Sequence, residues 1–159
     1  MSTLAPMTEV QYLEYIAEAI PAYAAEKVAA GQWSKEESLE LSRRSLEELL
    51  PQGLSTPDNN LFMVHDPEAQ VVGMLWIAVQ SRAGQRIAYV YDVIIKAEHR
   101  RKGHATRAFL AIEDEVRRLG LAGIALHVFG HNTAAQALYA RLGYQPTNIS
   151  LFKAVGRRV

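Results

Sequence analysis

Three short apolar segments in the middle of the chain constrain its fold most strongly. They are rich in β-branched and aromatic residues and cover residues 61–64, 71–79 and 87–95. Turn-forming residues separate them, with an Asp-Pro pair in the first gap and a glycine-containing run in the second. Gaps this short are typical of hairpins, so the segments predict three consecutive antiparallel strands.

Helical patterns precede this block of strands. After a short predicted strand at residues 3–7, Thr8 begins a capping-box pattern, and apolar residues then recur every three or four positions. Pro21 lies inside this pattern and is expected to kink or split the helix. Ser34 begins a second capping-box pattern, and the helix that follows it stops before Pro51. The sequence therefore predicts two helices between the first strand and the block.

Two further helices and two further strands are predicted after the block. Helical patterns begin at Gly103 and at Asn132, and Gly120 and Gly143 end them. The complete order is β-α-α-β-β-β-α-β-α-β, a mixed α/β (α+β) fold with a mostly antiparallel central sheet, in one domain over residues 1–159. The elements after the block are a helix at 103–119, a strand at 123–128, a helix at 132–142 and a strand at 149–153.

The composition excludes several classes of protein. Lysine and arginine balance aspartate and glutamate at 17 each, and this zero net charge argues against a nucleic-acid partner. The chain contains no cysteine, which excludes disulfides, thiolate metal sites and a cysteine nucleophile. No apolar run reaches the roughly 18 residues of a membrane span, and the first ten residues do not resemble a signal peptide. We therefore expect a cytoplasmic protein with no membrane partner.

The turn before the predicted helix at 103–119 is the most informative part of the chain. It carries Arg100, Arg101 and Lys102, followed by Gly103, which lets the backbone approach a ligand closely. A helix start presents backbone N–H groups without partners and favours negative charge, so a phosphate is stabilised there. The pattern predicts a phosphate or diphosphate site, although a solvated basic turn would have the same sequence. The P-loop and dinucleotide motifs are absent, so a different phosphate-bearing ligand is expected.

A second pair of polar residues lies on the predicted helix at 132–142. Asn132 begins this helix, and Tyr139 follows seven residues later on the same face. The asparagine side chain can bind an amide, and a phenol with a reference pKa of about 10 can return a proton to a departing thiolate. A plain N-cap and a core tyrosine are the alternative interpretations of these two residues.

Together these segments resemble the two signatures of the GNAT family of N-acetyltransferases. RRKGHA fits R/Q-x-x-G-x-G/A, and HNTAAQALYARLGY matches N-x-x-A-x-x-L-Y-x-x-x-G-F/Y at every fixed position. The spacing between the signatures and the order of the elements also match, so the resemblance covers nearly the full chain. It implies a sheet that splays between its fourth and fifth strands.

The resemblance also implies acetyl-coenzyme A as the cosubstrate, without a metal. The diphosphate would lie on the backbone from Arg101 to Thr106, and the pantetheine arm would pair with residues 93–95 like an extra strand. One amide of that strand would face the thioester oxygen. Asn132 would hold the arm, and Tyr139 would be the general acid. The predicted cofactor-binding residues are Val93, Ile94, Ile95, Arg100, Arg101, Lys102, Gly103, His104, Ala105, Thr106, Asn132 and Tyr139.

His127 and Asp92 are alternative candidates for the general base. Several members of the family carry a glutamate where this chain has His127, and a histidine with a reference pKa of about 6.5 could take the proton of an amine directly or through water. Asp92 lies inside an apolar strand, where an acidic residue needs a partner or a task. It could be the base or bind a cationic acceptor. Either residue could instead be structural, with His127 bonded to a carbonyl and Asp92 to a backbone or tyrosine donor.

The resemblance implies transfer of an acetyl group to a primary amine of a small molecule or peptide, by direct attack in a ternary complex. It does not identify that amine. A non-catalytic acyl-coenzyme A sensor on the same fold is the alternative function, and a homodimer is a candidate assembly because dimers are common among resembling proteins. Arg101 stands where the family often has glycine, and it carries a steric cost if its φ is positive.

Overall fold

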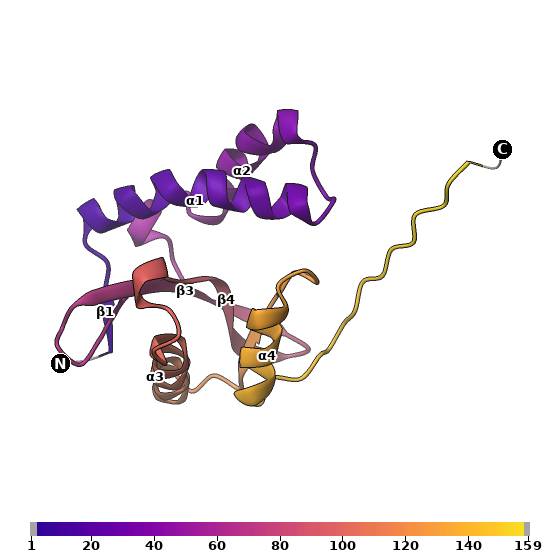
Figure 1. The fold of residues 1–159 in the computed structure, drawn as a ribbon. Coiled ribbons are helices and arrows are strands. Elements are labelled where there is room, and N and C mark those ends of the chain that lie inside the picture. Colours follow the sequence, from indigo (N-terminus) through magenta and orange to yellow (C-terminus); the bar gives the residue numbers. More distant parts are fainter. Residues whose placement is uncertain (1–2, 158–159) are drawn as a thin grey trace.

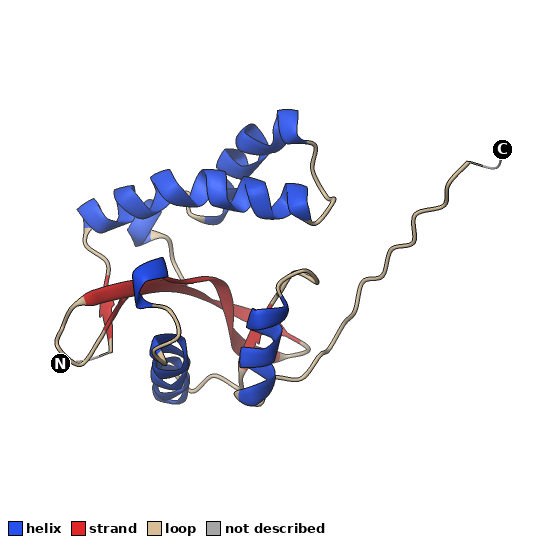
Figure 2. Cartoon of the chain, viewed as in Figure 1, coloured by secondary structure: helices blue, strands red, loops and turns tan. Residues whose placement is uncertain are grey.

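Five strands form one sheet, and their order in space follows their order in the chain (Figure 1, Figure 2). The computed structural model describes residues 3–157. Neighbouring strands pair antiparallel except for the last two, which are parallel, so the mixed and mostly antiparallel class is confirmed. The strands are β1 (Leu4–Pro6), β2 (Asn59–His65), β3 (Val71–Arg82), β4 (Gln85–Ile95) and β5 (Ile124–Leu126).

Helices cover both faces of the sheet. Figure 1 shows α1 and α2 on one face and α3 and α4 on the other. Because both faces are covered, the middle of β3 is buried continuously rather than at alternate residues. The helices are α1 (Glu9–Ala29), α2 (Lys35–Leu49), α3 (His104–Arg118) and α4 (Thr133–Arg141), with 3-10 turns η1 (Gly53–Ser55) and η2 (Ala97–His99).

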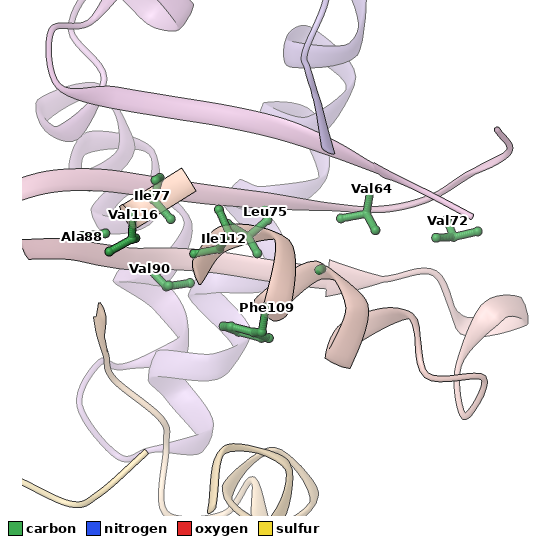
Figure 3. Packing of buried hydrophobic residues seen from close by; sticks show 10 residues of the cluster. Val64, Val72, Leu75, Ile77, Ala88, Val90, Phe109, Ile112 and Val116 are labelled. Atoms are coloured by element: carbon green, nitrogen blue, oxygen red, sulfur yellow. The ribbon is translucent and has the colours of Figure 1, made fainter. Parts of the chain in front are cut away.

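The larger core lies between the sheet and α3. The apolar stripe predicted for this helix is buried: Phe109 and Ile112 are at most 1% exposed and pack against residues of β3 and β4 (Figure 3). Burying each such side chain stabilises the fold by about 1.5–3 kcal/mol. The cluster consists of Val64, Val72, Leu75, Ile77, Ala88, Val90, Ala108, Phe109, Ile112 and Val116.

A second core lies between the opposite face of the sheet and the first two helices. Trp76 of β3 is 1% exposed there, and Tyr15 of α1 and Leu46 of α2 pack in the same cluster. The Trp76 indole N–H donates to Asn59 Oδ1 at 2.9 Å, so its polar atom is satisfied. This core fixes α1 above β4, the arrangement on which the site described below depends.

The helix ends follow the sequence patterns in part. The Thr8 capping box forms with Gln11 in both directions, as predicted. The expected box at Ser34 does not, since no capping hydrogen bond from that side chain occurs within the described chain. Pro21 does not split α1, which runs through it without interruption. The Ser42 hydroxyl of α2 donates to the Ile20 carbonyl beside the proline at 2.7 Å, which ties α1 to α2 at this point.

The predicted last strand at residues 149–153 is wrong. These described residues form no strand, and the chain after Tyr144 runs away from the sheet as an exposed, extended segment (Figure 1). A strand needs a neighbour for its backbone N–H and C=O groups. Pro146 holds the residue before it extended, which directs the segment outward. No strand among residues 3–157 pairs with this segment.

Gly73 lies where two backbones approach closely. Beside it, Val64 pairs with Gly73 and His65 with Val71, so β3 carries one extra residue at this bulge. A Cβ at Gly73 would lie 2.1 Å from the Ile94 carbonyl oxygen, which is backbone and cannot rotate away. Gly73→Ala is therefore expected to lower the free energy of unfolding by about 3 kcal/mol in urea denaturation.

Gly123→Ala is the matched control for this prediction. A Cβ at Gly123 would meet nothing within 4 Å among the described residues. The control is expected to change the unfolding free energy by less than about 0.5 kcal/mol. Equal effects of the two substitutions would contradict the close approach of β3 and β4 at Gly73.

Candidate active site

A bulge in β4 turns two consecutive side chains toward α1. Trp76 pairs with Asp92 but Ile77 pairs with Val90, so Tyr91 is an extra residue in β4. Tyr91 stacks on Trp76 with ring centroids 4.7 Å apart, and Asp92 accepts a hydrogen bond from α1. In a regular strand these neighbours would face opposite sides. The bulge therefore places the Asp92 carboxyl group on the α1 face of the sheet, the same face as the Tyr91 ring.

β4 and β5 separate immediately beyond this bulge. Their parallel pairing covers only three residue pairs and ends at Val90 opposite Leu126. Beyond Val90, the described residues 93–95 of β4 pair with β3 on one side and with no strand on the other. The splay between the fourth and fifth strands is thus present. It leaves a strand edge with backbone groups that an extended ligand could pair with.

The start of α3 presents unpaired backbone donors. Gly103, with φ of +80°, is the N-cap and provides no side chain to cap the helix. No hydrogen bond from the backbone N–H groups of 104–106 to any of residues 3–157 is present. Arg100, Arg101 and Lys102 are exposed beside them. A turn with free N–H groups, positive charge and a glycine has the properties that bind a diphosphate.

His104 faces the interior rather than the ligand side of this turn. Its side chain is only 8% exposed, and its Nδ1 accepts a hydrogen bond of 2.6 Å from Arg107 Nη2. Burial lowers the pKa of His104, and the positive charge of Arg107 lowers it further. The imidazole is therefore neutral at physiological pH, so only the backbone of His104 is available to a phosphate.

Arg101 occupies the left-handed backbone region with φ of +63°, so the steric cost anticipated from the sequence is present. A residue with a Cβ is disfavoured there by about 1 kcal/mol relative to glycine. Arg101→Gly is expected to raise the unfolding free energy by roughly 0.5–1 kcal/mol in urea denaturation. Arg100→Gly is the matched control, because Arg100 has φ of −71° and its Nε donates to the Ile95 carbonyl at 2.9 Å. Arg100→Gly is expected to lower the free energy of unfolding. An equal increase in both variants would contradict backbone strain at Arg101.

Tyr139 of α4 lies on the α3 side of the sheet, packed against the larger core. Its ring contacts Phe109 and Tyr144 edge-on, with centroids 5.3 Å and 5.7 Å away. Its hydroxyl makes no hydrogen bond to a described residue and is not among the fully buried, unpaired atoms, unlike that of Tyr144. Burial raises the pKa of Tyr139, and the negative charge of Asp92 raises it further. The phenol therefore stays protonated and free to donate.

Asp92 lies on the α1 side of the sheet, just beyond the last β4 residue that pairs with β5. The Tyr15 hydroxyl donates to Asp92 Oδ2 at 2.6 Å. Burial raises the pKa of Asp92, and the charge of Glu26 raises it too, while the bonds from Tyr15 and the Val93 N–H oppose these effects. The hydrogen bond from a tyrosine, which was the structural role considered for Asp92, is thus present. The same carboxylate can accept this bond and act as a general base. A carboxyl group with a raised pKa is a better proton acceptor than a free one.

The remaining candidates are more exposed. His127 lies just beyond the end of β5, is exposed, and contacts Phe129 edge-on at 5.1 Å. Asn132 caps α4, with its Oδ1 accepting from the Ala135 N–H at 3.2 Å. The capping interpretation of Asn132 is therefore correct, and its amide nitrogen remains available to a ligand. Among the described residues no three His, Asp or Glu side chains are grouped so as to hold a metal ion.

Sequence reasoning missed the residues that α1 contributes to the site. Tyr15 bonds to a carboxyl group 77 positions away, and Glu26 lies 3.2 Å from the His131 imidazole, 105 positions away. Both residues fit the amphipathic pattern of an ordinary helix. Only the need of Asp92 for a donor pointed toward a tyrosine, and nothing in the sequence selected Tyr15 among the seven tyrosines.

Comparison with known proteins identifies the family. The family model for the acetyltransferase (GNAT) family matches residues 23–144, more than half of the chain. This protein belongs to the GNAT family. The match spans the bulge and splay of β4, the start of α3 and Tyr139, and the protein is accordingly an acyltransferase. No helix within the described range is long and apolar enough to cross a bilayer.

Relatives of this GNAT protein occur in Bacillus subtilis strain 168. The uncharacterized N-acetyltransferase YycN is 36% identical over 150 residues, covering 94% of this chain and 96% of YycN. The uncharacterized N-acetyltransferase YdgE is 29% identical, covering 95% and 96%. The crystal structure of YycN superimposes with a TM-score of 0.92 at 35% identity, covering 97% of this chain and 98% of that one. The GNAT fold is therefore shared over essentially the whole described chain.

Proposed function

We propose that this protein transfers the acetyl group of acetyl-coenzyme A to a primary amine of a small molecule or peptide, by direct attack in a ternary complex. We further propose that the chain acts as one acetyltransferase domain in the cytoplasm. One observation carries the proposal. Asp92 lies in β4 just beyond the last residue paired with β5, and burial together with the negative charge of Asp92 raises the pKa of the Tyr139 phenol of α4.

The properties of the turn and of β4 support the assignment of the coenzyme A site. The unpaired N–H groups of 104–106 and the positive charges of Arg100 to Lys102 would bind the diphosphate. The unpaired edge of β4 at 93–95 would pair with the amides of the pantetheine arm, and one of its N–H groups would bind the thioester oxygen. The free amide nitrogen of Asn132 would donate to the same arm.

In the proposed reaction, acetyl-coenzyme A supplies an activated carbonyl carbon, which forms a bond to the amine nitrogen as the carbon–sulfur bond breaks. Asp92 takes a proton from the acceptor ammonium, directly or through water, because its raised pKa suits that role. Tyr139 donates its hydroxyl proton to the departing sulfur. The nitrogen loses a second proton as the amide forms, which restores the Tyr139 hydroxyl, and the proton taken up by Asp92 passes to solvent. One proton is therefore released for each ammonium consumed, and charge and atoms balance.

The α1 side of the gap favours a cationic acceptor. Two carboxylates, Asp92 and Glu26, lie near enough for one charge to raise the pKa of the other. The rings of Tyr89 and Tyr91, which precede Asp92 along β4, have centroids 4.8 Å apart. Carboxylates and aromatic faces together attract an ammonium group. His127 is the second candidate base, since it is exposed just beyond β5.

A thiol-release assay tests this function. The chain has no cysteine, so any thiol that reacts with a disulfide reagent comes from coenzyme A. Purified protein and acetyl-coenzyme A would be incubated with polyamines, amino acids, aminoglycosides and peptides. Amine-dependent thiol release with at least one class is expected. Tight binding of acetyl-coenzyme A without release across the panel would instead identify a non-catalytic acyl-coenzyme A sensor.

A further inference from the structure

A contact between three residues ties the first turn of α3 to the end of β2. Arg107 is partly buried, and its Nη2 donates to His104 Nδ1 at 2.6 Å. Both terminal nitrogens of the same guanidinium also donate to the His65 carbonyl at 3.4 Å. His65 is the last residue of β2 and precedes Arg107 by 42 positions. Two side chains of α3 therefore bind each other and a distant strand.

Arg107 makes these contacts without an acidic partner. Within residues 3–157, no carboxylate forms a salt bridge with its guanidinium. A partly buried arginine is usually paired with a carboxylate, but the acceptors of Arg107 are a carbonyl and an imidazole. Its positive charge is therefore not neutralised, and it favours an anion at the start of α3.

The bond from Arg107 also fixes the position of the proton in the His104 ring. A guanidinium can only donate, so Nδ1 must accept and the ring proton lies on Nε2. Protonation of Nδ1 would remove the acceptor and bring two positive groups together. Burial lowers the pKa of His104, as do the charges of Arg107, His99 of η2 and Lys102 of the turn, whereas Asp66 of the β2–β3 connection raises it. The bond is therefore intact at neutral pH.

We propose that His104 and Arg107 are positioning residues for coenzyme A, which hold the first turn of α3 so that its backbone N–H groups face the diphosphate. This inference rests on the proposed coenzyme A site at that turn. The N-cap Gly103 provides no side chain to hold the turn, and Arg101 before it has a strained, positive φ. The contact with the His65 carbonyl supplies the missing constraint. A turn that is already ordered binds its ligand without the cost of ordering it.

Calorimetric titration of coenzyme A with three variants tests the proposal. His104→Leu replaces the acceptor with an apolar side chain of similar size, and is expected to raise Kd about 10-fold at neutral pH. His104→Gln offers an acceptor oxygen that does not titrate, and is expected to recover most of this loss. His99→Gln is the matched control, because it removes the neighbouring imidazole, whose ring lies 6.2 Å from that of His104. Its Kd is expected to stay within about twofold of the unaltered protein. Thermal unfolding would establish that each variant is folded.

The dependence of Kd on pH separates positioning from a purely structural role. The phosphates of coenzyme A titrate with every variant, so the unaltered protein is compared with His104→Gln. As the pH is lowered from about 7.5 to about 5.5, the affinity of the unaltered protein should fall more steeply, because a protonated His104 cannot accept from Arg107. Parallel profiles, or tight binding by His104→Leu, would overturn the proposal. If the unaltered protein does not bind coenzyme A at all, the proposed function and this inference fall together.

Nitrogen NMR of labelled histidine tests the contact without any ligand. The His104 ring is expected to carry its proton on Nε2 at neutral pH, with Nδ1 bare. In an Arg107→Leu variant the Nδ1 resonance should shift, because its donor is removed. A proton on Nδ1 in the unaltered protein, or an Nδ1 resonance that Arg107→Leu leaves in place, would contradict the bond on which the positioning depends.

Discussion

Tyr139→Phe is expected to lower kcat by about 100- to 1,000-fold while the Kd for acetyl-coenzyme A changes by less than about twofold. The Tyr139 phenol has a hydroxyl without a hydrogen-bond partner among the described residues and a pKa raised by burial, and its ring packs on Phe109. Phenylalanine keeps the packing and removes only the proton donor. Steady-state kinetics with an active amine and calorimetric titration of acetyl-coenzyme A would measure the two quantities separately.

Tyr144→Phe is the matched control, because Tyr144 belongs to the same aromatic cluster. Its hydroxyl is buried without a hydrogen-bond partner in the described chain, and burial raises its pKa to about 12. Removing an unsatisfied buried hydroxyl is expected to leave kcat unchanged and to stabilise the fold slightly. A full rate for Tyr139→Phe, or an equal loss in both variants, would remove Tyr139 from the mechanism.

Asp92→Asn is expected to lower kcat/KM at neutral pH by about 100- to 1,000-fold, as loss of a general base does. In the unaltered protein, kcat/KM should fall as pH decreases through the raised pKa of Asp92. That acidic limb should be absent from the variant, since asparagine does not titrate. His127→Ala is the comparison variant, and we expect it to keep the acidic limb of the pH profile and most of kcat/KM. The opposite pattern would assign the base to His127.

Asp92 also predicts a dependence of stability on pH. Because burial raises its pKa in the folded state, the folded protein binds this proton more tightly than the unfolded chain. Its contribution to stability is therefore complete below the unfolded pKa, near 4, and is lost as pH rises through the folded pKa. The unfolding free energy should decrease less over this interval in Asp92→Asn than in the unaltered protein. Identical slopes in urea denaturation would contradict the burial of the carboxyl group.

The features that the sequence predicted are local ones. Short segments rich in β-branched and aromatic residues identified β2, β3 and β4, and the glycine at 103 with apolar period 3.6 identified α3. The Thr8 box and the N-cap at Asn132 depend on neighbouring residues only. The two signatures strengthened the prediction of the fold, because their spacing corresponds to one helix and one strand. Such features do not require knowledge of what lies across the sheet.

The features that escaped prediction depend on distant contacts. The extra residue Tyr91 turns Asp92 toward α1, yet IAYVYDVII reads as a regular alternating strand. Tyr15 and Glu26 look like ordinary residues of α1 until its packing places them beside β4. Residues 149–153 show the converse case: the sequence predicts a strand there, but pairing needs a partner that the described chain does not supply.

The binding of coenzyme A to isotopically labelled protein tests the central claim most directly. Acetyl-coenzyme A would be titrated while the backbone amide resonances are followed by NMR. We predict saturable shifts that are largest for the amides of residues 101–106 and 93–95, at the start of α3 and the free edge of β4. Shifts that centre elsewhere, or their absence at millimolar concentration, would contradict it.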